Sequence, residues 1–180
     1  MTDSKKICVI LASPSRKGST STLAEAAANA VEGADVHIHF LNNLKFRDCS
    51  GCHLCKQGKP CPLKDDLTPV LDDLRDCDAL IVATPVYFGR ATGLYYMYED
   101  RTFKLYTEQK EPPKRKALVI VSAGAPIQHA QPTAERIQKI LTRRNFDTSY
   151  LLHSTKEHGL PKDNPEMLEQ AREAGRKLFS

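Results

Sequence analysis

Short apolar runs alternate along this chain with longer segments of mixed polarity. Apolar runs at 6–12, 79–84 and 117–122 are rich in β-branched residues and predict strands buried on both faces. Residues 35–40 alternate strictly between apolar and polar positions, which predicts a strand with one wetter face. A fifth strand is predicted at 148–152.

Helical segments separate these strands. Hydroxyl residues and alanines predict the first helix, paired aspartates begin the second, and a proline begins the last. The predicted helices cover 19–31, 65–75, 90 to about 108, 133–144 and 165–179. Five strands alternating with five helices predict an α/β fold with a parallel sheet and right-handed crossovers.

The length of 180 residues predicts one domain over residues 1–180. Residues 41–64 interrupt the alternation as a long irregular insertion, and such loops usually carry function. His37 and His39 share the wetter face of their strand, and we interpret them as outward-facing residues rather than metal ligands.

Composition excludes some classes of partner. The net charge is only +4, and no basic stripe interleaved with aromatics indicates nucleic-acid binding. No apolar stretch approaches the roughly 20 residues needed to cross a membrane, and the N-terminal apolar run is too short for a signal peptide. We therefore expect a cytoplasmic protein.

The loop after the first strand is unusually rich in hydroxyl groups. It lacks the glycine patterns of dinucleotide and P-loop sites, but it leads into a helix whose free amides favour an anion. This composition predicts a phosphate-monoester site rather than an ordinary capped helix. The hydroxyl residues are Ser13, Ser15, Ser19, Thr20, Ser21 and Thr22, beside Arg16, Lys17 and Gly18.

Two further loops follow the central strands. One carries Tyr87, Phe88 and Gly89, and the other carries the small residues 122–126. Ligands of open α/β sheets bind beyond the carboxyl ends of the strands. The three loops together predict a flat aromatic cofactor with a phosphate tail.

Four cysteines crowd the insertion as Cys49-x2-Cys52-x2-Cys55-x5-Cys61. Thiols every third residue wrap one metal centre, and proline after Cys61 resembles the end of a ferredoxin motif. A [4Fe–4S] cluster is the favoured interpretation, while zinc or a metal-free loop stays an alternative. Disulfides are disfavoured by compartment, and the C-x-x-C-H match to a haem motif leaves two cysteines unexplained. Cys8 and Cys77 are expected in the core.

These motifs together resemble the flavodoxin-like NAD(P)H-dependent FMN reductase family, and especially its iron–sulfur flavoprotein branch. The resemblance rests on the S-P-rich loop at 13–15, the cysteine motif followed by Asp65-Asp66, the P-V-Y-F-G loop at 85–89 and the pair Asp100-Arg101. Relatives often carry Gly, Arg and Asn where this chain has Ala12, Ser15 and Ser19.

The resemblance implies a fold, a cofactor and a set of site residues. The fold would be a three-layer sandwich with strand order 2-1-3-4-5, and non-covalent FMN would bind a homodimer or homotetramer. The implied FMN contacts are Ser13, Ser15, Arg16, Gly18, Ser19, Thr20, Ser21, Pro85, Val86, Tyr87, Phe88, Gly89, Ser122, Ala123 and Gly124. The cluster ligands would be Cys49, Cys52, Cys55 and Cys61.

The cofactors would carry the chemistry, so no catalytic side chain is expected. Electrons would pass between the [4Fe–4S] cluster and FMN to a small acceptor, from a ferredoxin-type donor or NAD(P)H. Two alternatives remain: an NAD(P)H-dependent reductase of flavin, quinone or nitro compounds without a cluster, and a non-redox zinc-containing binding module. Aromatics on several faces of segment 93–106 predict a partner surface.

Overall fold

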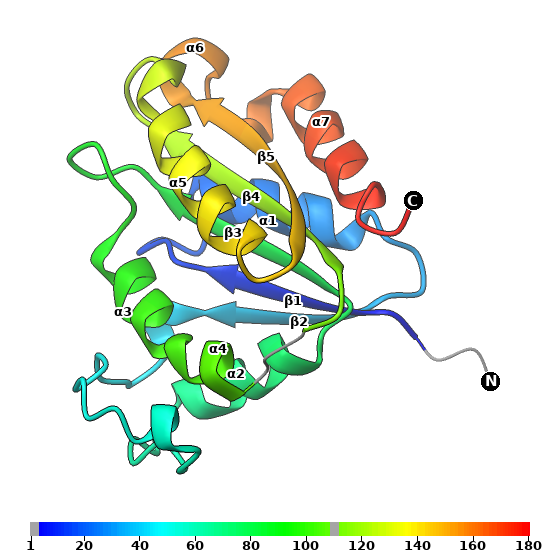
Figure 1. The fold of residues 1–180 in the computed structure, drawn as a ribbon. Coiled ribbons are helices and arrows are strands. Elements are labelled where there is room, and N and C mark those ends of the chain that lie inside the picture. Colours follow the sequence, from blue (N-terminus) through cyan, green and yellow to red (C-terminus); the bar gives the residue numbers. More distant parts are fainter. Residues whose placement is uncertain (1–3, 109–111) are drawn as a thin grey trace.

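A computed structural model describes residues 4–108 and 112–180, which form a five-stranded parallel sheet between two layers of helices (Figure 1). The strand order β2-β1-β3-β4-β5 confirms the predicted fold. The strands are β1 Lys6–Leu11, β2 Asp35–Phe40, β3 Ala79–Pro85, β4 Arg115–Ala123 and β5 Phe146–Ser154. All five predicted strands are therefore confirmed, with β4 and β5 longer than predicted because their polar ends still pair in the ladder.

The helices fall between the strands as predicted, with two additions. They are α1 Ser19–Asn29, α2 Leu67–Asp76, α3 Gly93–Arg101, α4 Phe103–Glu108, α5 Gln131–Thr142, α6 Thr155–His158 and α7 Pro165–Arg176. The single helix predicted over 90–108 is wrong, because the chain breaks at Thr102. The Thr102 hydroxyl donates to the Glu99 carbonyl in the preceding turn, and such back-bonding competes with a regular helix.

Alternate residues of each strand point into two separate cores. Cys8 and Ile10 face α2, α3, α4 and α5, whereas Ile7, Val9 and Leu11 face α1 and α7. Cys8 and Cys77 are both buried, as predicted, and burial raises the pKa of both thiols. Neither thiol therefore resembles an activated cysteine.

The prediction that His37 and His39 face outward is wrong. Their register places His37 beside Cys8 and His39 beside Ile10, on the sheet face covered by α2. Both imidazoles contact Asp73 of α2 and are only partly exposed. Alternation in the sequence identified the shared face correctly, but only packing shows that a helix covers it.

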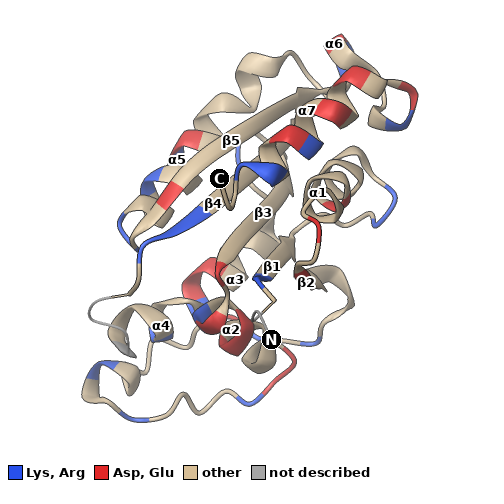
Figure 2. Cartoon of the chain, turned by 90° about the vertical axis from the view of Figure 1, so that its right-hand side faces the viewer, with Lys and Arg blue, Asp and Glu red and all other residues tan. Residues whose placement is uncertain are grey.

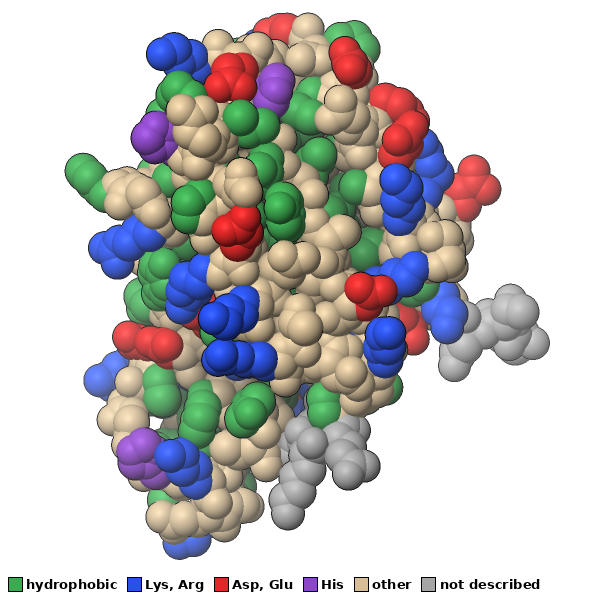
Figure 3. Space-filling model, turned by 45° about the horizontal axis from the view of Figure 1, so that its top comes forward, with side chains coloured by type: hydrophobic (Ala, Val, Ile, Leu, Met, Phe, Trp, Pro, Cys, Tyr) green, Lys and Arg blue, Asp and Glu red, His purple; other side chains and the backbone are tan. Residues whose placement is uncertain are grey.

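Two of the five aromatic side chains predicted to form a partner surface are not at the surface. Tyr95 and Tyr98 are buried in the core beneath α3. Tyr106 stays exposed, and hydrophobic side chains reach the surface between charged ones on the face seen in Figure 3. The predicted oligomer stays a prediction.

No helix in the described ranges is long and apolar enough to cross a membrane.

Helices α1 and α7 pack together through a glycine. A methyl group at Gly175 would overlap the backbone carbonyl of Ala27. Small residues at this contact therefore allow the two helices to lie side by side on one sheet face (Figure 1).

Gly175→Ala should destabilise the fold, because α1 and α7 must separate to admit the methyl group. Overpacking costs about 1–3 kcal/mol, which for a chain of this size lowers the melting temperature by roughly 3–10 °C. Gly93→Ala is the control, since its methyl group would meet nothing within 4 Å. Thermal unfolding followed by circular dichroism measures both variants. An unchanged melting temperature for Gly175→Ala would contradict the close approach.

Candidate functional site

Three loops at the carboxyl edge of the sheet form the first part of the site. They follow β1, β3 and β4, which are neighbours in the sheet. The Thr92 hydroxyl donates to the Ala12 carbonyl (2.7 Å), and the Val86 amide donates to the Ser122 carbonyl (2.8 Å). These bonds tie the three loops together, so the predicted loops do meet at one edge. Thr92 was not predicted, although its place at the N-cap of α3 is a recognisable signal.

The hydroxyl-rich loop divides its side chains between two tasks. The hydroxyls of Ser13 and Ser21 both donate to the Ser15 carbonyl, at 3.1 and 2.9 Å, and Thr22 donates to Gly18. These hydroxyls shape the loop. Those of Ser15, Ser19 and Thr20 make no hydrogen bond within the described part of the chain, and they are available to a ligand.

The N-terminus of α1 is open to an anion. Gly18 occupies the N-cap and supplies no side-chain acceptor to the first-turn amides. An uncapped helix N-terminus presents free N–H donors and a positive dipole end. Arg16 lies aside, over the Phe40 ring at 5.6 Å and 3.8 Å from Glu25. The groups open to a ligand here are therefore the backbone amides and the three hydroxyls, whereas the Arg16 guanidinium contacts Phe40 and Glu25.

The loop after β3 makes a tight turn at its tip. Tyr87 and Arg90 exchange backbone hydrogen bonds, and both central residues, Phe88 and Gly89, have positive φ angles of 51° and 74°. This is the type I′ arrangement of a two-residue hairpin. Phe88 is fully exposed and Tyr87 is half exposed. Of the residues implied to line a cofactor ring, Pro85 and Val86 lie at the strand end and these two lie at the loop tip.

The carboxyl end of β4 carries a buried hydroxyl–imidazole pair. Ser122 Oγ lies 2.5 Å from His153 Nδ1, and His153 Nε2 lies 3.0 Å from the Gly159 carbonyl. Since Nε2 must donate to that carbonyl, Nδ1 is the acceptor and the Ser122 hydroxyl donates to it. Burial lowers the pKa of His153, which favours this neutral form. His153 was not predicted as a site residue. Of the other residues implied to contact the cofactor from this strand end, Ala123 is buried and Gly124 is exposed.

The cysteine loop forms the second part of the site. It lies beside α3 and α4 (Figure 1), and all four of its cysteines line one cavity of about 490 Å³. The cavity wall also includes Asp100, Phe103 and Arg144. All six cysteines are free thiols. A backbone hydrogen bond from Leu54 lowers the pKa of Cys52, which favours the thiolate that metals bind.

The spacing of the thiols separates a single-ion site from a larger centre. No three of these cysteines have sulfurs within 4.8 Å of one another among the described residues. A tetrahedral zinc ion with bonds of about 2.3 Å would hold sulfurs about 3.8 Å apart. In a cubane each cysteine binds a different iron, so a wider arrangement is expected. The described thiols are therefore not gathered at single-ion spacing in this structure.

A buried ion pair closes the base of this loop. Arg101 donates to both Asp65 oxygens, at 2.7 and 3.2 Å, and to the Arg47 carbonyl at 2.7 Å. Its side chain is 2% exposed. Asp65 also accepts the Arg47 and Leu67 amides. Burial tends to raise the pKa of Asp65, but the bonds from Arg101 and the backbone lower it. One arginine of α3 thus joins the segments that flank the four cysteines.

A second cavity, of about 330 Å³, lies elsewhere. Its wall comes from α3, α4 and α5 and from the first residues of β4 and β5, Arg115 and Phe146. It therefore opens at the amino end of these strands, away from the three loops. Its shape does not mark it as the cofactor site, because ligands of such sheets bind at the carboxyl end.

Comparison with known proteins adds to this geometry. Residues 5–155 match the model of a family described as NADPH-dependent FMN reductase. The chain belongs to this family. An iron–sulfur flavoprotein of Methanocaldococcus jannaschii is 33% identical over 99 residues, which are 54% of this chain and 51% of that one. An iron–sulfur flavoprotein of Archaeoglobus fulgidus is 34% identical over 99 residues, 54% of this chain and 48% of its own.

The matched segment thus spans about half the length of these flavoprotein relatives. Among solved structures, the NAD(P)H:quinone oxidoreductase from Methanothermobacter marburgensis superposes with a TM-score of 0.73 at 20% identity. That match covers 98% of this chain and 97% of the other. The likeness confirms the flavodoxin-like fold of this member of the FMN reductase family.

Arg101→Gln should loosen the cysteine loop of this reductase-family chain. Removing one partner of a buried ion pair leaves an unpaired carboxylate, so the free energy of unfolding should fall by about 3–5 kcal/mol. Urea denaturation measures this loss, and proteinase K digestion should cleave the insertion first. Arg47→Gln is the matched control, because Arg101 contacts only the Arg47 backbone. Equal stability of the two variants would contradict the role of the ion pair.

Proposed function

We propose that this chain is an FMN-dependent oxidoreductase that passes electrons between a [4Fe–4S] cluster in the cysteine loop and FMN, and from FMN to a small acceptor. The observation that carries the proposal is the convergence of four free thiols on one cavity, in a chain whose sheet edge presents an uncapped anion site. A ferredoxin-type protein or NAD(P)H would supply the electrons.

The anion site supports FMN as the flavin. Free amides of α1 and the hydroxyls of Ser15, Ser19 and Thr20 lie together at the start of one helix, which suits one terminal phosphate. Pro85 to Gly89 and Ser122 to Gly124 would lie against the ring and the ribityl chain. The Ser122 hydroxyl is held by neutral His153, so its oxygen keeps lone pairs free to accept a hydrogen bond from the cofactor.

The two cofactor sites lie at opposite ends of α3. The helix begins beside Thr92, which contacts the flavin loops, and ends at Arg101, which holds the cysteine loop. Its nine residues span about 13 Å at 1.5 Å per residue. When bound, the cluster would carry single electrons and the flavin could exchange one or two. The chain itself would fix their separation and exclude water with the buried Tyr95 and Tyr98.

FMN should be the flavin that mass spectrometry identifies in the purified protein. Ser19→Asp should weaken FMN binding at least tenfold, because a carboxylate would face the phosphate where the helix dipole contributes only ~0.3–2 kcal/mol. Asn29→Asp adds the same charge at the far end of α1 and serves as the control. Extraction of FAD, or tight FMN binding by Ser19→Asp, would argue against this site.

Cys55→Ala should remove the cluster and spare the flavin. Anaerobic wild-type protein should contain about four irons and four sulfides per chain, and the variant should contain almost none. FMN should remain reducible by dithionite, while ferredoxin-driven reduction of the acceptor is lost. Lys59→Ala, in the same exposed loop, is the control. Ferredoxin-driven turnover that survives in Cys55→Ala would remove the cysteines from the electron path.

A second function, NAD(P)H-driven reduction of a small acceptor without a cluster, is favoured by the description of the matched family. The Cys55→Ala variant also distinguishes the two proposed functions. If NAD(P)H reduces FMN equally in wild type and Cys55→Ala, and no iron is found, the second function is supported. Stoichiometric zinc in colourless protein would instead support the binding module.

A further inference from the structure

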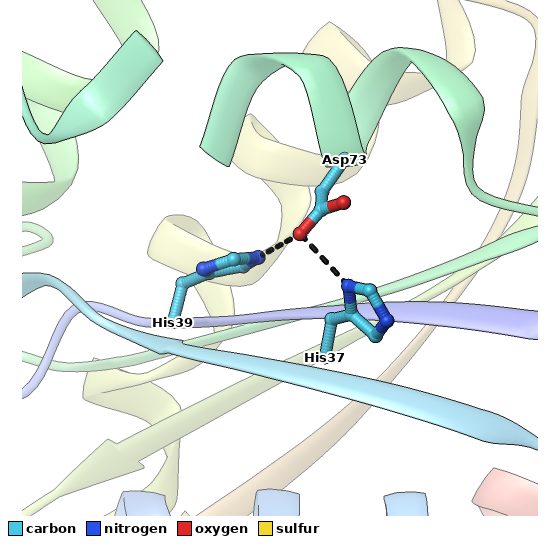
Figure 4. Close-up of side chains that lie close together, drawn as sticks. All are labelled: His37, His39 and Asp73. Atoms are coloured by element: carbon cyan, nitrogen blue, oxygen red, sulfur yellow. Dashed lines mark hydrogen bonds and ion pairs between the residues drawn. The ribbon is translucent and has the colours of Figure 1, made fainter. Parts of the chain in front are cut away.

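Two histidines and an aspartate converge between β2 and α2, outside the cysteine loop. His37 and His39 project from β2 toward Asp73 of α2, and one Asp73 oxygen, Oδ2, lies between the two rings (Figure 4). Oδ2 is 2.9 Å from His37 Nδ1 and 2.9 Å from His39 Nε2. One ligand atom from each of the three residues lies within 4.8 Å of the others.

In His37 and Asp73, the polar atom that does not face the centre of the triad already has a partner. His37 Nε2 lies 3.1 Å from an Asp35 oxygen, so the ring can donate there and leave Nδ1 as a lone pair. Asp73 Oδ1 accepts from the Lys6 ammonium at 2.6 Å, which turns Oδ2 toward the imidazoles. Carboxylates and cations behind the ligands orient metal sites in the same way.

The third ligand atom, His39 Nε2, contacts Asp73 but makes no hydrogen bond with regular geometry. His39 Nε2 is buried and makes no hydrogen bond in the described part of the chain, although Asp73 Oδ2 is 2.9 Å away. The direction of this contact is therefore unsuitable for a hydrogen bond. A buried ring nitrogen without a hydrogen bond is costly unless something else occupies its lone pair.

We propose that His37, His39 and Asp73 form a zinc-binding site that ties β2 to α2. Imidazole nitrogens and one carboxylate oxygen are ligands that Zn²⁺ prefers, whereas Mg²⁺ and Ca²⁺ prefer oxygen alone. Around a tetrahedral zinc with bonds of about 2.0 Å, ligand atoms lie about 3.3 Å apart. The two contacts of Asp73 Oδ2, each 2.9 Å, need only a small outward shift to reach this separation, and the two imidazole nitrogens lie within 4.8 Å of each other.

The surroundings suit a cation with a solvent ligand. The side chains of His37, His39 and Asp73 are 35%, 18% and 19% exposed, so water can reach a fourth position. Asp72 and Asp76 lie on the same helix, and Figure 2 shows acidic residues gathered on α2. Both of these carboxylates pair with Arg75, so the Asp35 carboxylate beside His37 is the charge that offsets the Lys6 ammonium on Asp73.

The site would join the elements on either side of the cysteine insertion. β2 ends at Phe40 and α2 begins at Leu67, and the insertion lies between them. Bound zinc would therefore hold together the two supports of that loop. It would do so whether or not the loop carries a cluster, and the proposal is independent of the redox function.

Zinc titration of the full chain tests the site. Because the exposed cysteines also bind zinc, they are first alkylated with iodoacetamide; Cys8 and Cys77 are buried. Equilibrium dialysis should find one zinc per capped wild-type chain. At 100-fold excess over the dissociation constant, the melting temperature should rise by roughly 5–10 °C. X-ray absorption at the zinc edge should show two imidazoles and no sulfur.

His39→Asn and Asp73→Asn should each abolish the rise in melting temperature on adding zinc. His129→Asn is the matched control, because this histidine is exposed and lies away from the triad. The measured quantity is the rise in melting temperature on adding zinc, so a variant that is less stable without metal can still be compared with the wild type. The proposal is overturned if capped wild type binds no zinc, if both variants keep the full increment, or if sulfur appears among the zinc neighbours.

Discussion

The ion pair between Arg101 and Asp65 is the constraint on which the cysteine loop depends. A long polar insertion has no apolar core of its own and must be held by its ends. Arg101 is almost fully buried at the end of α3, and it contacts Arg47, just before the first cysteine of the loop, and Asp65, just after the insertion. Because both charges have left water, the pair is stable only with complete hydrogen bonding, which the Arg47 and Leu67 backbone supplies.

The same helix connects that loop to the edge of the sheet. At its start, Thr92 caps α3 and donates to the Ala12 carbonyl after β1. At its end, Thr102 breaks the helix by bonding back to Glu99. A short helix between two threonines therefore sets the separation of the hydroxyl-rich loop and the cysteine cavity. The tyrosines of α3 that face the sheet keep it in place.

Hydroxyl groups after β1 show how one composition can serve two purposes. Ser13 and Ser21 use their hydrogen bonds to shape the loop around the Ser15 carbonyl. Ser15, Ser19 and Thr20 remain available beside an uncapped helix. A loop that is ordered before its ligand arrives loses less entropy on binding, which favours affinity for a small anion.

The sequence by itself determined the strands and their parallel arrangement, and it located the two loops rich in hydroxyl groups and in thiols. A short apolar run forms a buried strand, and the turn residues on either side of it have local conformational preferences. The positions of the strands can therefore be predicted without knowing any distant contact. The order of the sheet followed from resemblance and was confirmed. Cysteine spacing is equally local, and it predicted that the four thiols share one site.

Only the tertiary structure decided which distant groups meet. The ion pair of Asp65 with Arg101 and the bond of Ser122 to His153 each join residues more than thirty positions apart. The same is true of Asp73 beneath the histidines of β2, which the sequence alone suggested were outward-facing. Local pattern identifies the face of a strand, but which element covers that face depends on how the whole chain packs.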